Sequence, residues 1–477
     1  MSIHPSIDTS TLWRVRVPSS LDNSARVAAD RRAQSLSQFI RDSVEHQLTL
    51  EAGTDAANET APGRSMMQRK LTAVSLFTGA GGLDVGLDST GRFDLLAAVE
   101  LQETFCKSLR RNQEQGRFGT SDTRIIQADL SVYTPRELMA ELGIKPGELD
   151  VLVGGPPCQS FSTAGRRGGV QDPRGQLIWN YLDFVRELRP KVFLMENVRG
   201  LLSAALEHRP IAERPPQGGE PLRPEEQPGS VFDLWLSDAL DMCGGEYRVD
   251  TFEVNAVNYG APQLRERVLV FGNRLGRVTP VLTPTHAQDD PMLAPYRTLR
   301  DALDGLQESQ PTLLDFSPRK KHYLDLVPTG GNWRSLPDDV AQESMGRAYH
   351  AKGGRSGWWR RLSWDLPSPT ITTMPNHSST SMCHPEQTRV LSVVECARVQ
   401  EFPDDWEFLG SVTEQMKQVG NAVPARLGII AGETVARLIE DASLDLAHDV
   451  PRATQTYIKS HVRTRRWWQN GQAVVQA

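Results

Sequence analysis

The sequence predicts an α/β fold of the nucleotide-binding type for the body of this protein. Three observations support the prediction: short apolar segments alternate with longer amphipathic ones over 71–198, glycines follow the first apolar segment, and polar residues end several others. This alternation is typical of parallel strands joined by crossover helices. At roughly 150 residues per domain, a chain of 477 residues holds about three folding units.

Composition places the chain among globular proteins without a membrane segment. Apolar residues make up 39% and charged residues 23%, and no apolar run reaches the roughly 18 residues that a membrane helix needs. The first residues lack the apolar stretch and cleavage site of a secretory signal, so we expect a soluble, cytosolic protein. The net charge of −6 gives no whole-chain reason to bind nucleic acid, so any basic surface must be local.

The cysteines indicate neither a disulfide framework nor a zinc or other metal site, because they are scattered and form no CxxC pair. The default interpretation of each is a small, buried and unreactive hydrophobe, which its context must overturn. The chain has five: Cys106, Cys158, Cys243, Cys383 and Cys396.

Changes in composition mark the predicted domain boundaries. A small, polar stretch resembles a linker, six prolines in a later stretch forbid a long helix or central strand, and the tail is basic from Pro451 on. We expect an N-terminal module at 1–50, a linker at 51–69, a first part of the body at 70–274 with a flexible insertion at 203–230, a smaller irregular domain at 275–385, a return to the body at 386–440 and a basic tail at 441–477.

The first predicted strand, 71–77, ends in a glycine-rich turn that opens a helix. Glycines at 79, 81 and 82 let a ligand approach the backbone closely, and the helix start offers free amide donors. Such a turn serves NAD, FAD and S-adenosylmethionine alike, or has only a packing role.

Acidic residues end the next two predicted strands, 95–100 and 123–130. Glu100 closes the first of them, 23 residues after Phe77, where a carboxylate can accept from both ribose hydroxyls. Asp129 is placed to accept from an adenine amino group. Because ligands of open α/β sheets bind at the carboxyl ends of the strands, these positions indicate an adenosine cofactor. The alternative is that both acids are helix N-caps.

Two further strands end at the same predicted edge. The strand at 150–155 runs into two prolines that fix its exit, so Cys158 lies on a constrained loop and departs from the unreactive default. The strand at 192–198 brings Glu196 and Asn197 to this edge.

A later segment, 255–267, carries polar side chains at alternate positions. Gln263, Arg265 and Arg267 are predicted to alternate along one strand and to share one face. Such a pattern is most often a solvated edge strand.

Five motifs resemble, in order, those of bacterial-type DNA cytosine-5 methyltransferases. They are FTGAGG, PPCQSFS, ENV, QLRER and QVGNAVP, spread over about 71–440. The resemblance implies a Rossmann-like, S-adenosylmethionine-dependent methyltransferase domain with a target recognition domain at 275–385. Two positions depart from the family pattern: Ser75 stands where many members carry Asp, and Leu101 where many carry an aromatic residue. We expect both to loosen cofactor contacts.

The resemblance also implies a reaction at carbon 5 of cytosine. This carbon is too poor a nucleophile to take a methyl group until a thiolate adds at carbon 6, a role that falls to Cys158. Glu196 would donate to nitrogen 3 of the base, and Arg267 would pair with oxygen 2. The predicted catalytic set is completed by Asn197 and by two residues that resemble loop or phosphate anchors, Arg265 and Gln263.

The implied methyl donor is S-adenosylmethionine. The residues implied to bind it are Phe77, Gly79, Gly81, Gly82, Glu100, Asp129, Leu130, Pro157, Leu177 and Asn421. Because these groups cannot reach a cytosine inside a duplex, the base must be flipped out of double-stranded DNA.

Several arginines are candidates for DNA contacts. The segment after Cys158 has glycines for motion and three arginines for phosphates, so we expect it to close over the DNA. Two arginines of the recognition domain either hold phosphates, which is the favoured interpretation, or read guanine edges. These candidates are Arg166, Arg167 and Arg174 in the loop, and Arg360 and Arg361 in the recognition domain.

The first 50 residues resemble a ribbon-helix-helix module. Residues 12–17 alternate as in a two-faced strand, and two helices follow, the second with a capping-box pattern at 35–38. The resemblance implies a homodimer whose ribbon reads a major groove through Arg14 and Arg16, at a second DNA site such as its own promoter. The alternative is an amphipathic helical pair that docks on the body.

Two other functions stay open. An RNA cytosine-5 methyltransferase shares the motif set, although the long recognition region and the N-terminal module favour DNA. A catalytically idle DNA-binding repressor is the second, and the intact Cys158, Glu196 and Arg267 argue against it.

Overall fold

The computed structural model describes residues 69–157, 176–288, 290–350 and 355–443, and the backbone of three short strands in the tail. The chain divides into two compact units, Met1–Arg69 and Lys70–Ala477. All of the first unit except Arg69 lies outside the described residues, and so do the predicted N-terminal module and nearly all of the linker. The second unit holds the fold and the candidate site.

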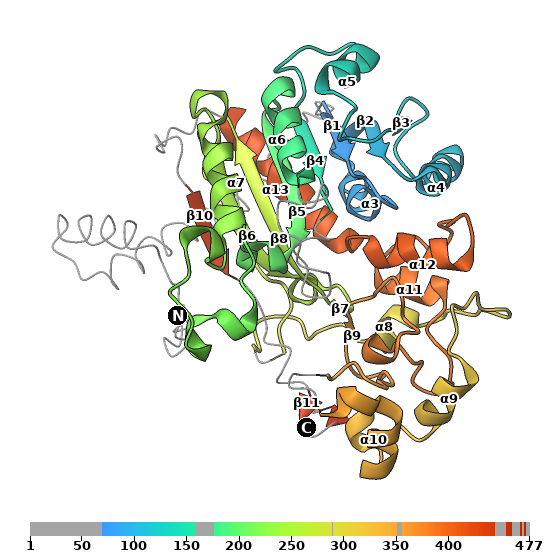
Figure 1. Cartoon of the computed structure of the whole chain (residues 1–477). Helices are drawn as coiled ribbons and strands as arrows, with labels where there is room; N and C mark the ends of the chain where they lie inside the picture. Colours follow the sequence, from blue (N-terminus) through green and yellow to red (C-terminus); the bar gives the residue numbers. More distant parts are fainter. Residues whose placement is uncertain are drawn as a thin grey trace, which may run out of the picture. The chain divides into compact units, whose positions relative to one another are not determined.

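An eight-stranded sheet forms the body of the second unit and confirms the predicted α/β fold (Figure 1). Its strand order is β10-β6-β8-β5-β4-β1-β2-β3, and all neighbours are parallel except that β8 runs antiparallel to β5 and β6. The strands are β1 (Leu71–Leu76), β2 (Phe93–Glu100), β3 (Arg124–Gln127), β4 (Val151–Gly154), β5 (Val192–Val198), β6 (Arg248–Asn255), β8 (Glu266–Asn273) and β10 (Gln455–Lys459).

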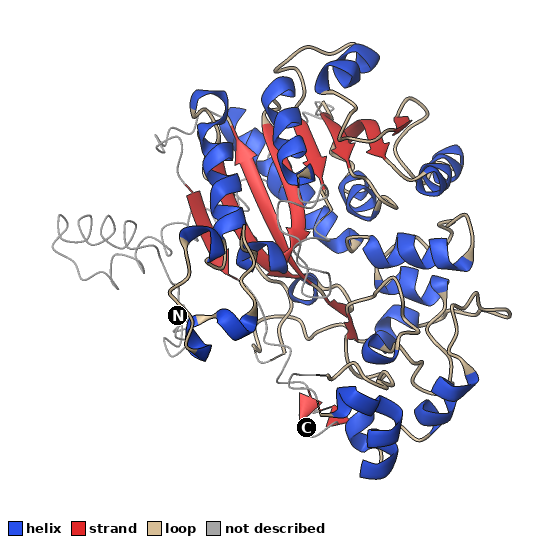
Figure 2. Cartoon of the chain, in the orientation of Figure 1, coloured by secondary structure: helices blue, strands red, loops and turns tan. Residues whose placement is uncertain are grey.

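Helices cover both faces of this sheet, as Figure 2 shows. One face packs on α3 (Gly82–Ser89), α4 (Glu103–Glu114) and α13 (Ala425–Ser443), and the other on α5 (Pro135–Leu142), α6 (Leu177–Leu188) and α7 (Ser230–Asp241). Adjacent residues of a strand enter opposite cores: on β1, Ala73 packs on the first face and Val74 on the second. Because both faces are buried, the central strands β4 and β5 are largely apolar, with sequences VLVG and VFLMENV. None of the described helices is long and apolar enough to span a bilayer.

A smaller, irregular region follows β8 and returns to the body through α11 and α12. It has its own apolar core, which contains Tyr323, Leu324, Trp359 and Val390. Its elements are α8 (Leu299–Leu303), α9 (Pro318–Asp325), α10 (Asp338–Met345) and β9 (Ser368–Pro369), and the chain returns through α11 (Val393–Val399) and α12 (Val412–Asn421). Strand β9 pairs in parallel with β7 (Gln263–Leu264), which precedes β8 in the chain. Short 3₁₀ helices complete the described elements: η3 (Arg199–Ser203), η7 (Met242–Gly244), η8 (Ala256–Tyr259), η9 (Trp333–Ser335), η10 (Gly346–Tyr349) and η11 (Ser378–Thr380).

The segment from 263 to 267 corrects a prediction. Gln263 lies on β7 and Arg267 on β8, so the two belong to different sheets and not to one strand with a shared face. The break falls at Arg265, whose backbone N–H donates to Asn255 Oδ1 over 2.9 Å instead of entering a ladder. All three side chains are buried, so the alternative of a solvated edge strand is also wrong.

The proline-rich insertion forms no long helix or strand, as its prolines predict. It contains η4 (Ile211–Glu213), η5 (Pro215–Gln217) and η6 (Pro224–Glu226). Glu226 accepts from Arg209 Nε over 2.9 Å and from the backbone N–H of Arg223 over 2.8 Å, and these contacts hold the pKa of Glu226 at about 2. These contacts join parts of the segment, and the flexibility that its composition predicts stays a prediction.

The basic tail contributes an edge to the main sheet. Strand β10 pairs in parallel with β6, from Gln455 opposite Val249 to Lys459 opposite Glu253. Farther on, β11 (Trp468–Gln469) pairs with β12 (Gln472–Ala473).

Candidate functional site

A cavity of about 710 Å³ lies at the carboxyl ends of the central parallel strands. Most of the residues that the sequence predicts for a site line it: Phe77, Gly79, Gly82, Glu100, Asp129, Leu130, Pro157, Leu177 and Asn421 from the predicted cofactor set, and Glu196, Asn197, Arg265 and Arg267 from the predicted catalytic set. Gly81 and Gln263 are not among the described lining residues. Cys158 and the loop arginines 166, 167 and 174 lie outside the described residues, as do Arg14 and Arg16.

The glycine-rich turn gives one wall of the cavity its shape. Gly79 and Gly81 have φ values of +61° and +82°, in the left-handed region that favours glycine. A Cβ on Gly82 would lie 2.3 Å from the carbonyl oxygen of Val423, so the start of α3 touches the backbone of another cavity segment. A Cβ on Gly81 would lie 3.0 Å from Leu109 and Phe118 side-chain atoms. Gly81 therefore serves packing and the turn, not the cavity surface.

Glu100 holds the turn and the next helix together at the cavity wall. Its Oε2 accepts from the backbone N–H of Gly79 and its Oε1 from that of Gln102, each over 2.8 Å. Burial raises the pKa of Glu100, and these backbone hydrogen bonds oppose the shift. Gln102 is the N-cap of α4, so Glu100 is not itself the cap residue.

Asp129 lies on the turn that follows β3. Its Oδ1 accepts from the backbone N–H of Ser131 over 2.9 Å, and this hydrogen bond lowers the pKa of Asp129. Thr134 is the N-cap of α5, so the N-cap alternative fails for Asp129 as well. Both acids remain at the cavity, where each oxygen has a second lone pair for a ligand.

At the other end of the cavity, Glu196 and Arg267 form a buried ion pair. Arg267 Nε lies 2.6 Å from Glu196 Oε1, and the two residues come from the adjacent strands β5 and β8. Arg267 Nη1 also donates to the carbonyl of Glu266 over 2.7 Å, which fixes the guanidinium. Asn197 donates to the carbonyl of Pro156 over 3.2 Å and thereby ties β5 to the loop that leads to Cys158.

Arg265 and Gln263 act on the far wall of the cavity. Arg265 donates to the carbonyls of Ile371 and Gly420 over 3.0 and 3.1 Å, and both of these residues line the cavity. Gln263 accepts from the Ile371 N–H over 3.0 Å and donates to Gln400 Oε1 over 2.9 Å. Arg265 and Gln263 therefore hold the segment after β9, and Arg265 also holds α12, against the sheet.

The cavity also takes residues that the sequence argument missed. Asp84 lies in the first turn of α3, Lys417 lies on α12, and three threonines come from the segment after β9: Thr370, Thr372 and Thr373. Asp84 and Lys417 stand inside or beside the FTGAGG and QVGNAVP motifs, which is the signal that could have found them. The threonines lie in the segment LSWDLPSPTITT at 362–373, which is similar to a motif of the family that the sequence resembles, so this segment is the signal that could have found them.

The recognition-domain arginines lie inside that domain. Arg361 is 5% exposed and donates to the carbonyls of Val327, Leu324 and His384 over 2.8, 2.7 and 3.1 Å, and to Thr388 Oγ1 over 2.9 Å. A guanidinium with four protein acceptors has no free edge for DNA, so we revise the prediction for Arg361 to a structural anchor. Burial lowers the pKa of Arg360 to about 10, and its Nε donates to the carbonyl of Ser381.

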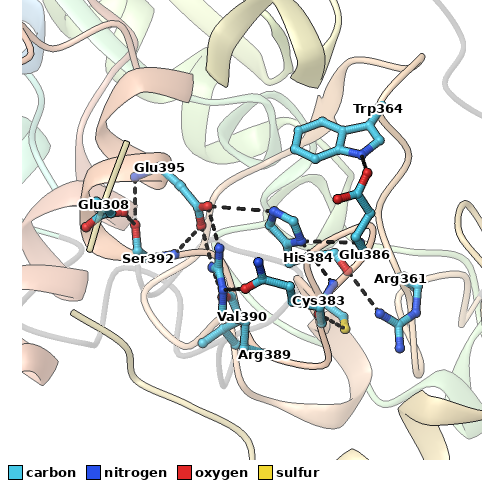
Figure 3. Close-up of polar contacts among 11 residues, drawn as sticks. Glu308, Arg361, Trp364, Cys383, His384, Glu386, Arg389, Val390, Ser392 and Glu395 are labelled. Atoms are coloured by element: carbon cyan, nitrogen blue, oxygen red, sulfur yellow. Dashed lines mark hydrogen bonds and ion pairs between the residues drawn. The ribbon is translucent and has the colours of Figure 1, made fainter. Parts of the chain in front are cut away.

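A polar cluster joins this domain to α11, as Figure 3 shows. Arg389 donates to both carboxylate oxygens of Glu395 over 2.7 and 2.8 Å. The carboxylate also accepts from the Ser392 N–H over 2.7 Å, and His384 Nε2 lies 3.8 Å from it. Burial lowers the pKa of His384. This cluster is a structural joint apart from the cavity, because none of these residues lines the cavity.

Three of the four described cysteines, Cys106, Cys383 and Cys396, are buried as the default interpretation predicts, whereas Cys243 is partly exposed. Burial raises the pKa of all four thiols, to about 11 for Cys106 and to about 12 for Cys383. All four are free thiols. Among the described residues, no three His, Cys, Asp or Glu side chains are grouped to hold a metal ion.

Comparison with known proteins gives consistent matches. The sequence profile of the C-5 cytosine-specific DNA methylase family matches residues 71–214 and 225–436. The Type II methyltransferase M.Sau96I of Staphylococcus aureus is 34% identical over 364 residues, which cover 76% of this chain and 75% of that protein. The Type II methyltransferase M.Eco47II of Escherichia coli is 35% identical over 376 residues, covering 77% and 79%.

A solved structure shares the fold. It is described as that of a candidate DNA modification methyltransferase encoded within an E. coli prophage, and it matches with a TM-score of 0.52 at 23% identity, covering 78% of this chain and 100% of that one. The sheet and its helices therefore have a counterpart in an experimental structure.

Proposed function

The chain belongs to the C-5 cytosine-specific DNA methylase family and is a DNA (cytosine-5-)-methyltransferase, and we propose that it methylates a flipped-out cytosine within a specific duplex sequence, with S-adenosylmethionine as donor. One observation carries the proposal: a single cavity holds acceptors suited to an adenosine at one end and a buried carboxylate–guanidinium pair at the other. Its matches to Type II methyltransferases support a role in restriction–modification. Because the substrate is DNA, we place the enzyme in the cytoplasm.

The described residues fit the donor. Glu100 presents carboxylate oxygens at the wall where ribose hydroxyls would lie, and Asp129 lies farther along the same edge for the adenine amino group. Leu177 and Asn421 would complete the enclosure. When bound, S-adenosylmethionine would supply an electrophilic methyl group.

The pair at the other end suits a cytosine. Nitrogen 3 and oxygen 2 are neighbours on the ring, so a base needs a proton donor and a cation side by side. Glu196 and Arg267, 2.6 Å apart, are placed as such a pair. Glu196 would first have to take up a proton, which it would then give to nitrogen 3 as charge develops, and Arg267 would neutralise oxygen 2.

Cys158 would be the attacking group, although it lies outside the described residues. Its thiolate would form a bond to carbon 6 while Glu196 protonates nitrogen 3, which leaves carbon 5 electron-rich. After carbon 5 is methylated, loss of its proton and β-elimination would break the sulfur–carbon bond and free the thiol. The loop of 158–175 would close over the flipped base, with arginines 166, 167 and 174 on phosphates.

Covalent trapping tests this mechanism. A duplex with 5-fluorocytosine at the target position cannot lose the group on carbon 5, so with S-adenosylmethionine it should stay attached to residue 158. The adduct is detected by denaturing gel and peptide mass, and Cys158→Ala is the control. A wild-type chain that methylates DNA without forming the adduct would contradict the role of Cys158.

Two rivals are separated by tritiated methyl transfer. The proposed function predicts label in duplex DNA and none in RNA, whereas an RNA methyltransferase gives the reverse. An idle repressor gives label in neither. Bisulfite sequencing of DNA from an expressing host then identifies the methylated sequence.

For the N-terminal segment we propose a ribbon-helix-helix dimer that binds a second DNA site through Arg14 and Arg16. The family match begins at residue 71, so this segment lies outside the part of the chain that the family model matches. Deletion of residues 1–55 should give a monomer that still methylates DNA. A truncated chain whose mass in solution equals that of the full chain would argue against the dimer.

A further inference from the structure

One oxygen of a buried carboxyl group at the start of α3 lacks a hydrogen-bond partner. Asp84 is 2% exposed, and within the described part of the chain nothing donates to its Oδ1. The carboxyl group does receive a hydrogen bond from the side chain of Ser75, and Asp84 lines the cavity. An unpaired buried carboxyl oxygen costs free energy, so its persistence at a cavity indicates a ligand that pairs it.

The strand order locates Asp84 between the two ends of the cavity. Glu100 ends β2 and Asp129 follows β3 on one side of β1, whereas Glu196 on β5 and Arg267 on β8 lie on its other side, beyond β4. Asp84 is carried by the helix that directly follows β1. A donor with its adenosine at the first end and its methyl group near the second must pass β1, so its amino-acid portion lies near this helix.

We propose that Asp84 is a further cofactor-contacting residue, whose Oδ1 accepts a hydrogen bond from the α-ammonium group of S-adenosylmethionine. The inference rests on the proposed function, since it names a contact to the donor of that reaction. A carboxylate and an ammonium group form a charge-assisted hydrogen bond, roughly twice as strong as a neutral one.

The neighbours of Asp84 are arranged to orient it. Thr78 Oγ1 donates to Ser75 Oγ over 3.1 Å, and Ser75 in turn hydrogen-bonds to the Asp84 carboxyl group. Ser75 also stands where many family members carry Asp. Ser75 and Thr78 thus supply two hydroxyl groups that hold the carboxyl group of Asp84 from the end of β1.

Calorimetric binding to the full-length chain tests the contact at pH 7.5. S-adenosylhomocysteine carries the ammonium group, whereas 5′-methylthioadenosine keeps the adenosine and lacks the whole amino-acid end. Asp84→Asn and the smaller Asp84→Ser both remove the charge. If one of these variants does not fold, the ligand affinities are measured with the other. The matched control is Asp88→Asn, one turn farther along α3, because Asp88 is not among the described lining residues.

We expect Asp84→Asn to weaken S-adenosylhomocysteine binding by about tenfold or more, the size expected for a hydrogen bond to a charged group. Binding of 5′-methylthioadenosine should change by less than about twofold, and Asp88→Asn should change neither affinity. Wild-type affinity in both Asp84 variants, or an equal loss for the two ligands, would overturn the inference while leaving the proposed function intact. A wild-type chain that binds neither ligand would overturn both.

Discussion

Asp84 also affects stability, because its charge is buried. Burial raises the pKa of Asp84 from 3.8 to about 6, with the like charge of Asp88 adding to the shift and the Ser75 hydrogen bond opposing it. The folded chain therefore keeps a proton on Asp84 between about pH 4 and 6, where the unfolded chain has lost it. Stability falls as the pH rises across this interval, by about 3 kcal/mol for a shift of this size.

Asp84→Asn should therefore stabilise the ligand-free protein at neutral pH. Asn carries no charge, so the free energy of unfolding of the variant should exceed that of the wild type at pH 7.5 and match it more closely at pH 4. Urea unfolding at both pH values measures the difference. A difference that does not grow with pH would show that the pKa of Asp84 is the same in the folded and the unfolded chain. Together, the two predictions describe Asp84 as a residue whose buried charge lowers the stability of the ligand-free protein and binds the cofactor.

At the scale of elements, two helices of the body touch backbone to backbone. A Cβ on Gly428 of α13 would lie 2.2 Å from the carbonyl oxygen of Leu83 and 2.9 Å from the Cα of Gly86, both on α3. A Cβ on Gly86 would lie 2.1 Å from the carbonyl oxygen of Ala425. The position of α3, and with it Asp84 and the turn before it, therefore depends on glycine at both contact points.

Gly428→Ala should weaken both folding and donor binding. The added methyl group has only backbone to push against, so we expect a loss of about 1–3 kcal/mol in the free energy of unfolding. Because α3 must shift, the affinity for S-adenosylhomocysteine should fall too. Glu433→Ala, on the exposed side of the same helix, is the control and should change neither quantity. Unaltered affinity in a destabilised Gly428→Ala variant would uncouple the helix contact from the site.

Arg361 gives a second prediction at this scale. Arg361→Ala leaves the carbonyls of Leu324, Val327 and His384 without their donor inside the recognition domain, so we expect a loss of at least about 2 kcal/mol. If Arg361 contacted a phosphate, its replacement would instead reduce the slope of the logarithm of DNA affinity against the logarithm of salt concentration by about one. We expect that slope to stay unchanged. Arg347→Ala, at an exposed position of the same domain, is the control for stability.

The sequence predicted these elements well because their two determinants, apolar runs and glycine-containing turns, lie within each segment itself. The predicted strands at 71–77 and 192–198 are observed at Leu71–Leu76 and Val192–Val198, since apolar runs and glycine turns encode them directly. The polar residues of 263–267 were misjudged, because Gln263 and Arg265 bind groups more than 100 residues away along the chain and Arg267 pairs with Glu196 of another strand. A charged residue in sequence resembles a surface residue, and only the packed structure shows that Arg361 is buried.

At the scale of the whole molecule, the cavity and the tail lie at different parts of one sheet. Described lining residues come from β1, β2, β5, β8 and the segments around them, including the loop after β4, and none belongs to β6 or β10. All residues of β6 are buried, and β10 covers its outer backbone edge. The tail is therefore expected to protect the sheet without taking part in the reaction.

A chain that ends after Ser443 should keep its chemistry and lose solubility. Removal of β10 exposes the backbone donors and acceptors of β6, and an unpaired edge beside a buried strand promotes pairing with another chain. We expect light scattering to increase with time and the thermal midpoint to fall, while methyl transfer per folded molecule stays at the wild-type level. A chain that ends after Lys459 retains β10 and is the matched control, because it loses the rest of the basic tail. If both truncations aggregate equally, the segment after residue 459 and not β10 protects the sheet; if neither does, the edge of β6 needs no cover.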